Sequence, residues 1–232
     1  ILFLILLAVV LFAALSYAVT NSTRGGGNNA SNEKSQAQAA ELMNYFAQMS
    51  TTVQRMMLTG GVKDYELNFY YGGASRYVYG SLDNTNCTET RCRVFDPAGG
   101  GMTGQSLVRF TRNQAYDQRE RLLFLSIPGV GTSAPDIVFM QGTVDSSICK
   151  AINVKAGLND IIYNASFPTA SAVIQYQFAP SMGSIPDNGN ALSGITPEIG
   201  SMGTFCFCSA ANLAACEADV QSPRVFHVLV AR

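Results

Sequence analysis

The strongest constraint in this sequence is an uncharged, almost wholly apolar run at its N-terminal end. Residues 1–19 contain no Asp, Glu, Lys or Arg, and only Ser16 and Tyr17 interrupt the apolar side chains. At 1.5 Å of rise per residue, a helix of this length spans roughly 28 Å, which matches the hydrocarbon core of a bilayer. We therefore expect a hydrophobic transmembrane or filament-core helix over 1–19, hidden from water by lipid or by other helices.

A secretory signal peptide is the alternative interpretation of such a run. Signal peptides begin with Met, carry a basic segment, have a shorter apolar stretch and are removed from the mature protein. This chain begins at Ile1. We therefore expect the run to be retained in the mature protein, after a basic leader has been cut off.

A glycine-rich segment follows the apolar run. Gly25, Gly26 and Gly27 are consecutive and are flanked by Asn, Ser and Thr. Each glycine costs a helix about 1 kcal/mol relative to alanine. The sequence therefore predicts a helix break near 20–29, within a linker over 20–32 in which the three glycines act as a hinge.

Helical periodicity returns after this linker. Asn32 is a suitable N-cap, and Gly60 with Gly61 is a suitable terminator. Between them, apolar residues recur at spacings of three and four, which predicts a second, amphipathic helix over 33–58. The stripe consists of Ala39, Leu42, Met43, Phe46, Met49, Val53, Met56 and Met57.

From residue 65 onward, short runs of β-branched and aromatic residues are separated by Gly, Pro, Asn and Asp. We expect one short helix, over 146–156. The fold class is thus α+β, with residues 33–232 forming one globular head that contains an antiparallel, β-rich, disulfide-bonded domain. The expected strands are 65–71, 76–79, 121–127, 136–143, 172–178, 204–208 and 225–231.

The six cysteines indicate an oxidising compartment, because their number is even and the apolar run places the rest of the chain outside the cytoplasm. Cys87 and Cys92 flank four residues and are expected to close a small loop. Cys206 and Cys208 are two positions apart on an expected strand and so face the same side, which leaves Cys149 and Cys216 as their partners. Spacing alone leaves both divisions open, and we favour Cys208 with Cys216 and Cys149 with Cys206.

The sequence lacks the residue patterns that several kinds of binding and catalytic site require. Lys and Arg number 15 against 16 Asp and Glu, so no nucleic-acid partner is expected. A Gly-rich segment at 99–106 has Gln105 where a phosphate-binding loop has lysine. The single histidine, His227, lies in an apolar run and is expected to have a structural or surface role. We predict no catalytic residue, no metal site, no cofactor and no enzymatic activity.

The order of these segments resembles that of type IV pilins and the related pseudopilins. The run ILFLILLAVVL over residues 1–11 is similar to the pilin N-terminal helix. Family members commonly begin with Phe and carry Glu at the fifth position, whereas this chain has Ile1 and Ile5. Small side chains in the same run would allow close helix approach.

The resemblance implies a structural subunit of an extracellular, type IV pilus-like filament on a bacterial surface, serving adhesion, attachment or motility. Its expected partners are identical subunits in a helical homopolymer and the inner membrane, which would hold the precursor before assembly; a surface ligand stays unknown. Alternatives are a single-pass, membrane-anchored ectodomain that binds a ligand, and a pseudopilin of a secretion system. The expected assembly core consists of Ile1, Phe3, Ile5, Ala8, Phe12, Ala13, Ala14 and Ser16.

Overall fold

The fold is taken from a computed structural model. It describes residues 2–69, 84, 86–105, 107–110, 120–125, 131, 136–141, 144–165, 203–209, 216 and 223–231. Within α1, side chains are described at positions 10–12, 16 and 30–58.

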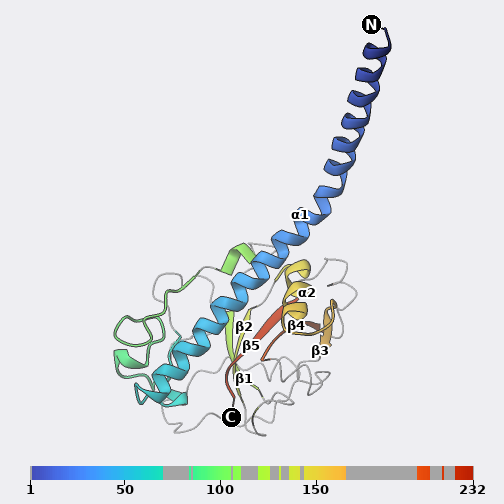
Figure 1. The fold of residues 1–232 in the computed structure, drawn as a ribbon. Helices are drawn as coiled ribbons and strands as arrows, with labels where there is room; N and C mark the ends of the chain where they lie inside the picture. The colour runs from blue at the N-terminus through green and yellow to red at the C-terminus, as the bar shows by residue number, and fades with distance from the viewer. Residues whose placement is uncertain are drawn as a thin grey trace.

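One long helix dominates the molecule. Helix α1 (Leu2–Leu58) is continuous over 57 residues. Its C-terminal half lies across the globular head, and its N-terminal half projects away from the head (Figure 1). The predicted break near 20–29 is therefore wrong, and so is the division into two helices; Gly25, Gly26 and Gly27 lie inside α1.

The physical reason for the unbroken helix is that propensity is a weak prior. Each glycine weakens a helix, yet once a helix is nucleated every further residue adds one hydrogen bond. The segment 20–29 has helix on both sides, and the part from Ala39 to Met56 is fixed by burial against the head. The three glycines lower the stability of this stretch without ending the helix.

The expectation of a membrane-crossing segment is also corrected. Within the part of the chain that the structure describes, no helix combines sufficient length with sufficient apolar character to cross a membrane. The apolar run belongs to a much longer helix, whose following residues are mostly polar.

The head is built on a five-stranded sheet in the order β1-β2-β5-β4-β3. Neighbouring strands are antiparallel except β3, which is parallel to β4, so the expected purely antiparallel sheet is wrong at this edge. The strands are β1 (Glu120–Leu125), β2 (Asp136–Gln141), β3 (Tyr163–Ala165), β4 (Thr204–Ser209) and β5 (Arg224–Val230). Among the described residues, the remaining elements are α2 (Ser146–Lys155) and three 3-10 helices, η1 (Asp64–Glu66), η2 (Thr90–Cys92) and η3 (Leu107–Phe110).

The strand predicted at 65–71 is replaced by η1 and a single bridge between Asn68 and Arg93. The side chain of Asn84 explains this, because its amide donates to the carbonyls of Tyr65 (2.7 Å) and Leu67 (3.0 Å). A buried amide thus satisfies backbone groups that a neighbouring strand would otherwise bind. The strands expected at 76–79 and 172–178 lie outside the described residues.

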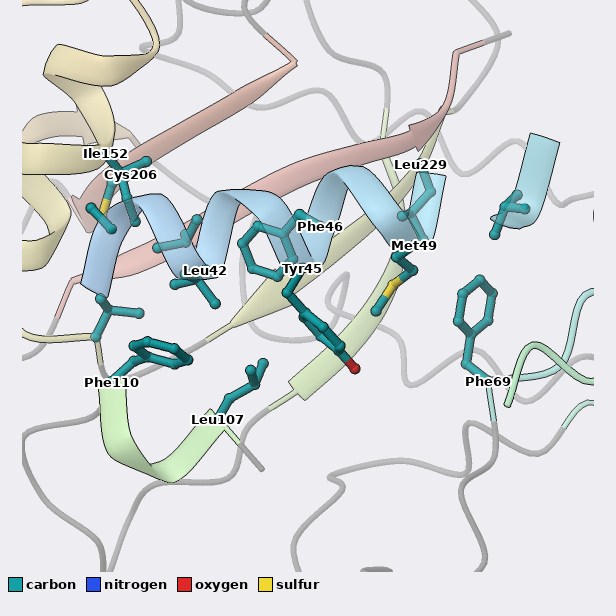
Figure 2. Close-up of a cluster of buried hydrophobic side chains, with 14 of the residues drawn as sticks. Leu42, Tyr45, Phe46, Met49, Phe69, Leu107, Phe110, Ile152, Cys206 and Leu229 are labelled. Carbon is teal, nitrogen blue, oxygen red and sulfur yellow. The ribbon is translucent and has the colours of Figure 1, made fainter. Parts of the chain in front are cut away.

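Helices α1 and α2 cover one face of the sheet. Residues of α1 at spacings of three and four point into a core that η3, α2 and β5 complete, as Figure 2 shows. Leu42, Phe46 and Met49 are fully buried there. Burial of such side chains contributes about 1.5–3 kcal/mol each, which fixes α1 to the head.

The opposite face of the sheet carries a separate aromatic cluster. Phe205 and Phe207 of β4 alternate with Cys206 and therefore point away from the helices. Both rings lie against Phe226 of β5, with centroids 5.7 and 4.6 Å apart. All three are fully buried, so β4 and β5 have buried side chains on both faces.

A tight backbone approach joins the C-terminal part of α1 to the loop at 93–102. A Cβ atom on Gly100 would overlap the carbonyl oxygen of Val94 and would lie 2.8 Å from the methyl group of Thr52. Gly100 is buried, and its carbonyl accepts a hydrogen bond from Arg55 of α1. Only glycine fits at this position.

We expect the substitution Gly100→Ala to lower the free energy of unfolding by about 2–3 kcal/mol, because overpacking forces the backbone apart. Urea denaturation measures the change. Ala98→Ser is a suitable control, since Ala98 is exposed in the same loop. Equal stability of the two variants would contradict the proposed overlap.

Candidate functional site

The projecting half of α1 is the most unusual surface of the molecule. Residues 30–34 are exposed, and Ser35 is the first buried residue among those of α1 whose side chains are described, so the contact with the head is described from there onward. Further out, Val10, Leu11 and Phe12 are 57%, 62% and 73% exposed. Successive helical residues point 100° apart, so these three side chains present apolar surface around more than half of the helix.

The exposed side chains of Val10, Leu11 and Phe12 form contiguous apolar surface on the projecting half of α1. Contiguous apolar surface of this type marks interaction sites in soluble proteins. Within the described part of the chain, none of the elements of the head reaches these residues. The projecting half of α1 is therefore the candidate functional site.

The residues of the predicted assembly core are distributed along this helix. Phe12 and Ser16 are exposed, as an interface open to another molecule requires. Phe3, Ile5, Ala8, Ala13 and Ala14 lie in α1, with only their backbone described. Ile1 lies outside the described residues.

Polar contacts fix the direction in which the helix leaves the head. Ser35 of α1 hydrogen-bonds Ser147 of α2, with the two hydroxyl oxygens 2.8 Å apart. Next to it, Glu41 pairs with Arg109 at 2.6 Å, and Gln38 donates to the backbone carbonyl of Arg109 at 3.2 Å. These contacts lie where α1 emerges, so they orient the projecting half.

Three disulfides stabilise the head. They are Cys87–Cys92, Cys149–Cys206 and Cys208–Cys216, which matches the division favoured from the sequence. The second joins α2 to β4, and the third starts from the same strand.

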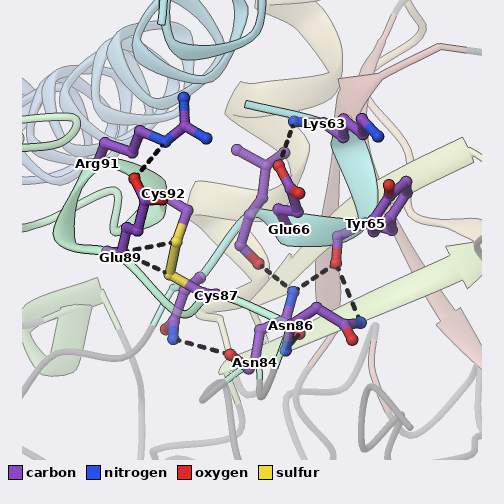
Figure 3. The surroundings of a disulfide bond; sticks show 11 residues. Lys63, Tyr65, Glu66, Asn84, Asn86, Cys87, Glu89, Arg91 and Cys92 are labelled. Carbon is purple, nitrogen blue, oxygen red and sulfur yellow. Dashed lines mark hydrogen bonds and ion pairs between the residues drawn. A yellow bond between two sulfur atoms is a disulfide. The ribbon is translucent and has the colours of Figure 1, made fainter. Parts of the chain in front are cut away.

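The Cys87–Cys92 disulfide lies in a dense set of loop contacts, which Figure 3 shows. Arg91 pairs with Glu89 at 2.8 Å. The side chain of Asn84 accepts from the backbone of Asn86 at 2.9 Å. The small closed loop is therefore held to the segment that follows α1.

His227 connects the sheet to α1. Its Nε2 atom lies 2.7 Å from the hydroxyl oxygen of Ser50, and its Nδ1 atom lies 2.6 Å from the hydroxyl oxygen of Thr204. The ring stacks on Phe46 with centroids 5.2 Å apart. Burial lowers the pKa of His227 to about 4, although a hydrogen bond to the Phe46 backbone acts in the opposite direction. The imidazole is therefore neutral at pH 7.

The line of Ser50, His227 and Thr204 has the distances of a nucleophile, a base and an orienting group. Its chemistry does not fit that role. A base with a pKa near 4 removes a proton poorly at neutral pH, and a threonine hydroxyl lacks the negative charge that stabilises an imidazolium. The arrangement instead joins two elements of the fold.

The sequence did not identify Ser50 or Thr204 as partners of His227. These residues are 177 and 23 positions away, and a lone histidine in an apolar run carries no signal of what faces it. The side of the strand was predictable: His227 points toward α1, whereas Phe226 points to the opposite face.

Metal binding finds no support among the residues that the structure describes. They include no group of three or more His, Cys, Asp or Glu side chains that could hold an ion. All six cysteines are in disulfides, which removes their thiolates as ligands.

Comparison with known proteins yields no relative. No protein-family model, no curated protein and no solved structure matches this chain.

Proposed function

We propose that this protein is a structural subunit that assembles with identical copies into a pilus-like extracellular filament, through the projecting half of α1. The observation that carries the proposal is the exposure of Val10, Leu11 and Phe12 on a helix that extends beyond the head. Burial of three such side chains between copies would contribute roughly 5 kcal/mol or more for each subunit. This gain acts against the loss of translational and rotational freedom on association, which costs about 4–15 kcal/mol, so stable assembly needs more apolar surface than these three side chains, and the rest of the apolar run at 1–19 offers it.

Two further features support this proposal. A helix that is apolar around most of its circumference at these positions can contact several neighbours at once, as a bundle of parallel copies requires. A surface patch that meets a different patch on the next copy generates an open assembly rather than a closed dimer. Three disulfides in one head also suit a protein that works in an oxidising, extracellular environment.

The test is assembly of the purified full-length chain, followed by sedimentation and negative-stain electron microscopy. The unmodified protein should sediment and form filaments of uniform diameter. Phe12→Asp should abolish them, since a charge at the centre of an apolar contact would be buried without a partner. Phe12→Leu, which keeps the side chain apolar, should assemble as the unmodified protein does.

Two results would contradict the proposal. One is unmodified protein that stays monomeric at high concentration. The other is Phe12→Asp protein that forms filaments in normal yield. Short filaments of limited length, in place of long ones, would favour the pseudopilus form of the same assembly.

A further inference from the structure

The contact between α1 and the sheet around His227 is built from uncharged groups. His227 is 9% exposed and lies between Ser50 on α1 and Thr204 on β4. A neutral imidazole offers one donor and one acceptor, and a hydroxyl group on each side can match either tautomer. Both ring nitrogens are therefore satisfied while the ring is neutral.

The described charges around His227 point elsewhere. On α1, Glu41 pairs with Arg109, and Arg55 donates to the carbonyl of Gly100. On β5, Arg224 is three positions from His227 and so lies on the opposite face of the sheet. Strand β4 contains no charged residue, and its two cysteines are in disulfides.

The remaining carboxyl group near this contact is on β2. Asp136 is fully buried and lies three residues along β2 from Phe139, the residue that pairs with His227. At about 3.3 Å per residue, this places it roughly 10 Å along the strand. Among the residues that the structure describes, the groups that directly face His227 are thus neutral: the two hydroxyls, the ring of Phe46 and its backbone carbonyl.

We propose that this contact is an acid-opened latch, in which protonation of His227 releases α1 from β5, the strand against which it packs. An imidazolium held in place would be a buried cation without a carboxylate. Movement of α1 away from the sheet would expose the ring to water, and the same movement breaks the contact with Ser50. The proposal concerns the head alone and does not depend on filament formation.

The direction of the pH effect follows from the pKa of His227. Its folded value is about 4, below the ordinary 6.5, so the opened form binds the proton more tightly. The latch is closed above pH 6.5, and its opening becomes more favourable as the pH falls from 6.5 through 4. Relative to pH 8, linkage gives about a 30-fold rise in the opening equilibrium at pH 5 and about a 150-fold rise at pH 4.

The experiment is native-state hydrogen exchange, read by mass spectrometry on peptides that cover residues 42–54, between pH 4 and pH 8. After correction for the intrinsic exchange rate, opening of this part of α1 should rise about 30-fold between pH 8 and pH 5. In the His227→Gln variant, which keeps a neutral hydrogen-bonding side chain, opening should be independent of pH. Peptides that cover β1, an edge strand that pairs with β2 and lies two strands from β5, serve as an internal control and should not follow the same curve.

Several results would overturn the latch. They are pH-independent opening in the unmodified protein, an equal pH response in His227→Gln, and a simultaneous rise in every peptide, which would indicate global unfolding. If His227→Gln does not fold, NMR titration of the histidine ring in the unmodified protein decides the matter. The latch requires a midpoint near 4 together with the rise in exchange over residues 42–54, and it is contradicted by a midpoint near 6.5 or by a midpoint near 4 without that rise.

Discussion

The substitution Asn153→Asp should lower the free energy of unfolding by about 3–5 kcal/mol at pH 7, because it buries a charge without a partner. Asn153 is fully buried on α2. Its Oδ1 atom accepts from the backbone N–H of Cys206 at 2.7 Å. Its Nδ2 atom donates to the carbonyls of Cys206 at 2.9 Å and of Ile161 at 2.8 Å.

This side chain completes the sheet where a strand is missing. Strand β3 pairs with β4 only from Phe207 onward, so the outer edge of Cys206 has no strand beside it. The amide of Asn153 binds both backbone groups of Cys206 at that edge. An aspartate would keep the acceptor but would place its second oxygen against two carbonyl oxygens.

The effect of Asn153→Asp should depend on pH in a defined direction. Burial next to carbonyls raises the pKa of the new carboxyl group, so the folded state binds its proton more tightly than the unfolded state does. The stability deficit should therefore shrink as the pH falls from 7 toward 4. Urea denaturation at several pH values measures this, and Asn44→Asp, on the exposed face of α1, is the matched control. A loss below about 1 kcal/mol at pH 7 would contradict the role given to the amide.

The second large effect concerns the disulfides. Removing Cys149–Cys206 by the double substitution Cys149→Ala and Cys206→Ala should cost more stability than removing Cys87–Cys92 in the same way. The bonded residues are 57 positions apart in the first pair and 5 in the second. The loop-entropy treatment gives losses of about 4 and about 2 kcal/mol, respectively.

Thermal and urea unfolding of the two double variants measures this difference. The comparison is informative because both pairs lie within the same head and both variants remove two sulfur atoms. The Cys149–Cys206 variant also loses the covalent connection between α2 and β4, which should raise hydrogen exchange in α2 specifically. Equal losses in the two variants would show that loop length does not govern their contribution.

Predictions from the sequence were most accurate where a residue type or pattern has one predominant structural role. The apolar stripe at 39–57 identified the buried face of α1, because period 3.6 and burial have the same cause. Spacing and strand alternation predicted the Cys87–Cys92 pair and left two divisions of the other four cysteines, of which the favoured one is observed. Strand β5 was placed within one residue of its observed limits, because its apolar run is bounded by polar residues.

The incorrect predictions share a different cause. Each observed feature that they missed depends on residues that are distant in sequence. The glycine segment at 25–27 was given too much weight, because local propensity does not include the helix on either side of it. The parallel pairing of β3 with β4, and the amide of Asn84 in place of a strand, arise from contacts that no local pattern encodes. The candidate site was found through its apolar character, whereas its orientation came only from the contacts of Ser35 and Glu41.

The unbroken helix turns the molecule into a lever. The projecting part of α1, from Leu2 to about residue 34, is roughly 50 Å long at 1.5 Å per residue. A tilt of the head by about 5° would then displace the far end sideways by about 4 Å. Small rearrangements at the surface of the head would be amplified into lateral movement of the opposite end, and a pull on that end would apply a torque to the contacts around Ser35.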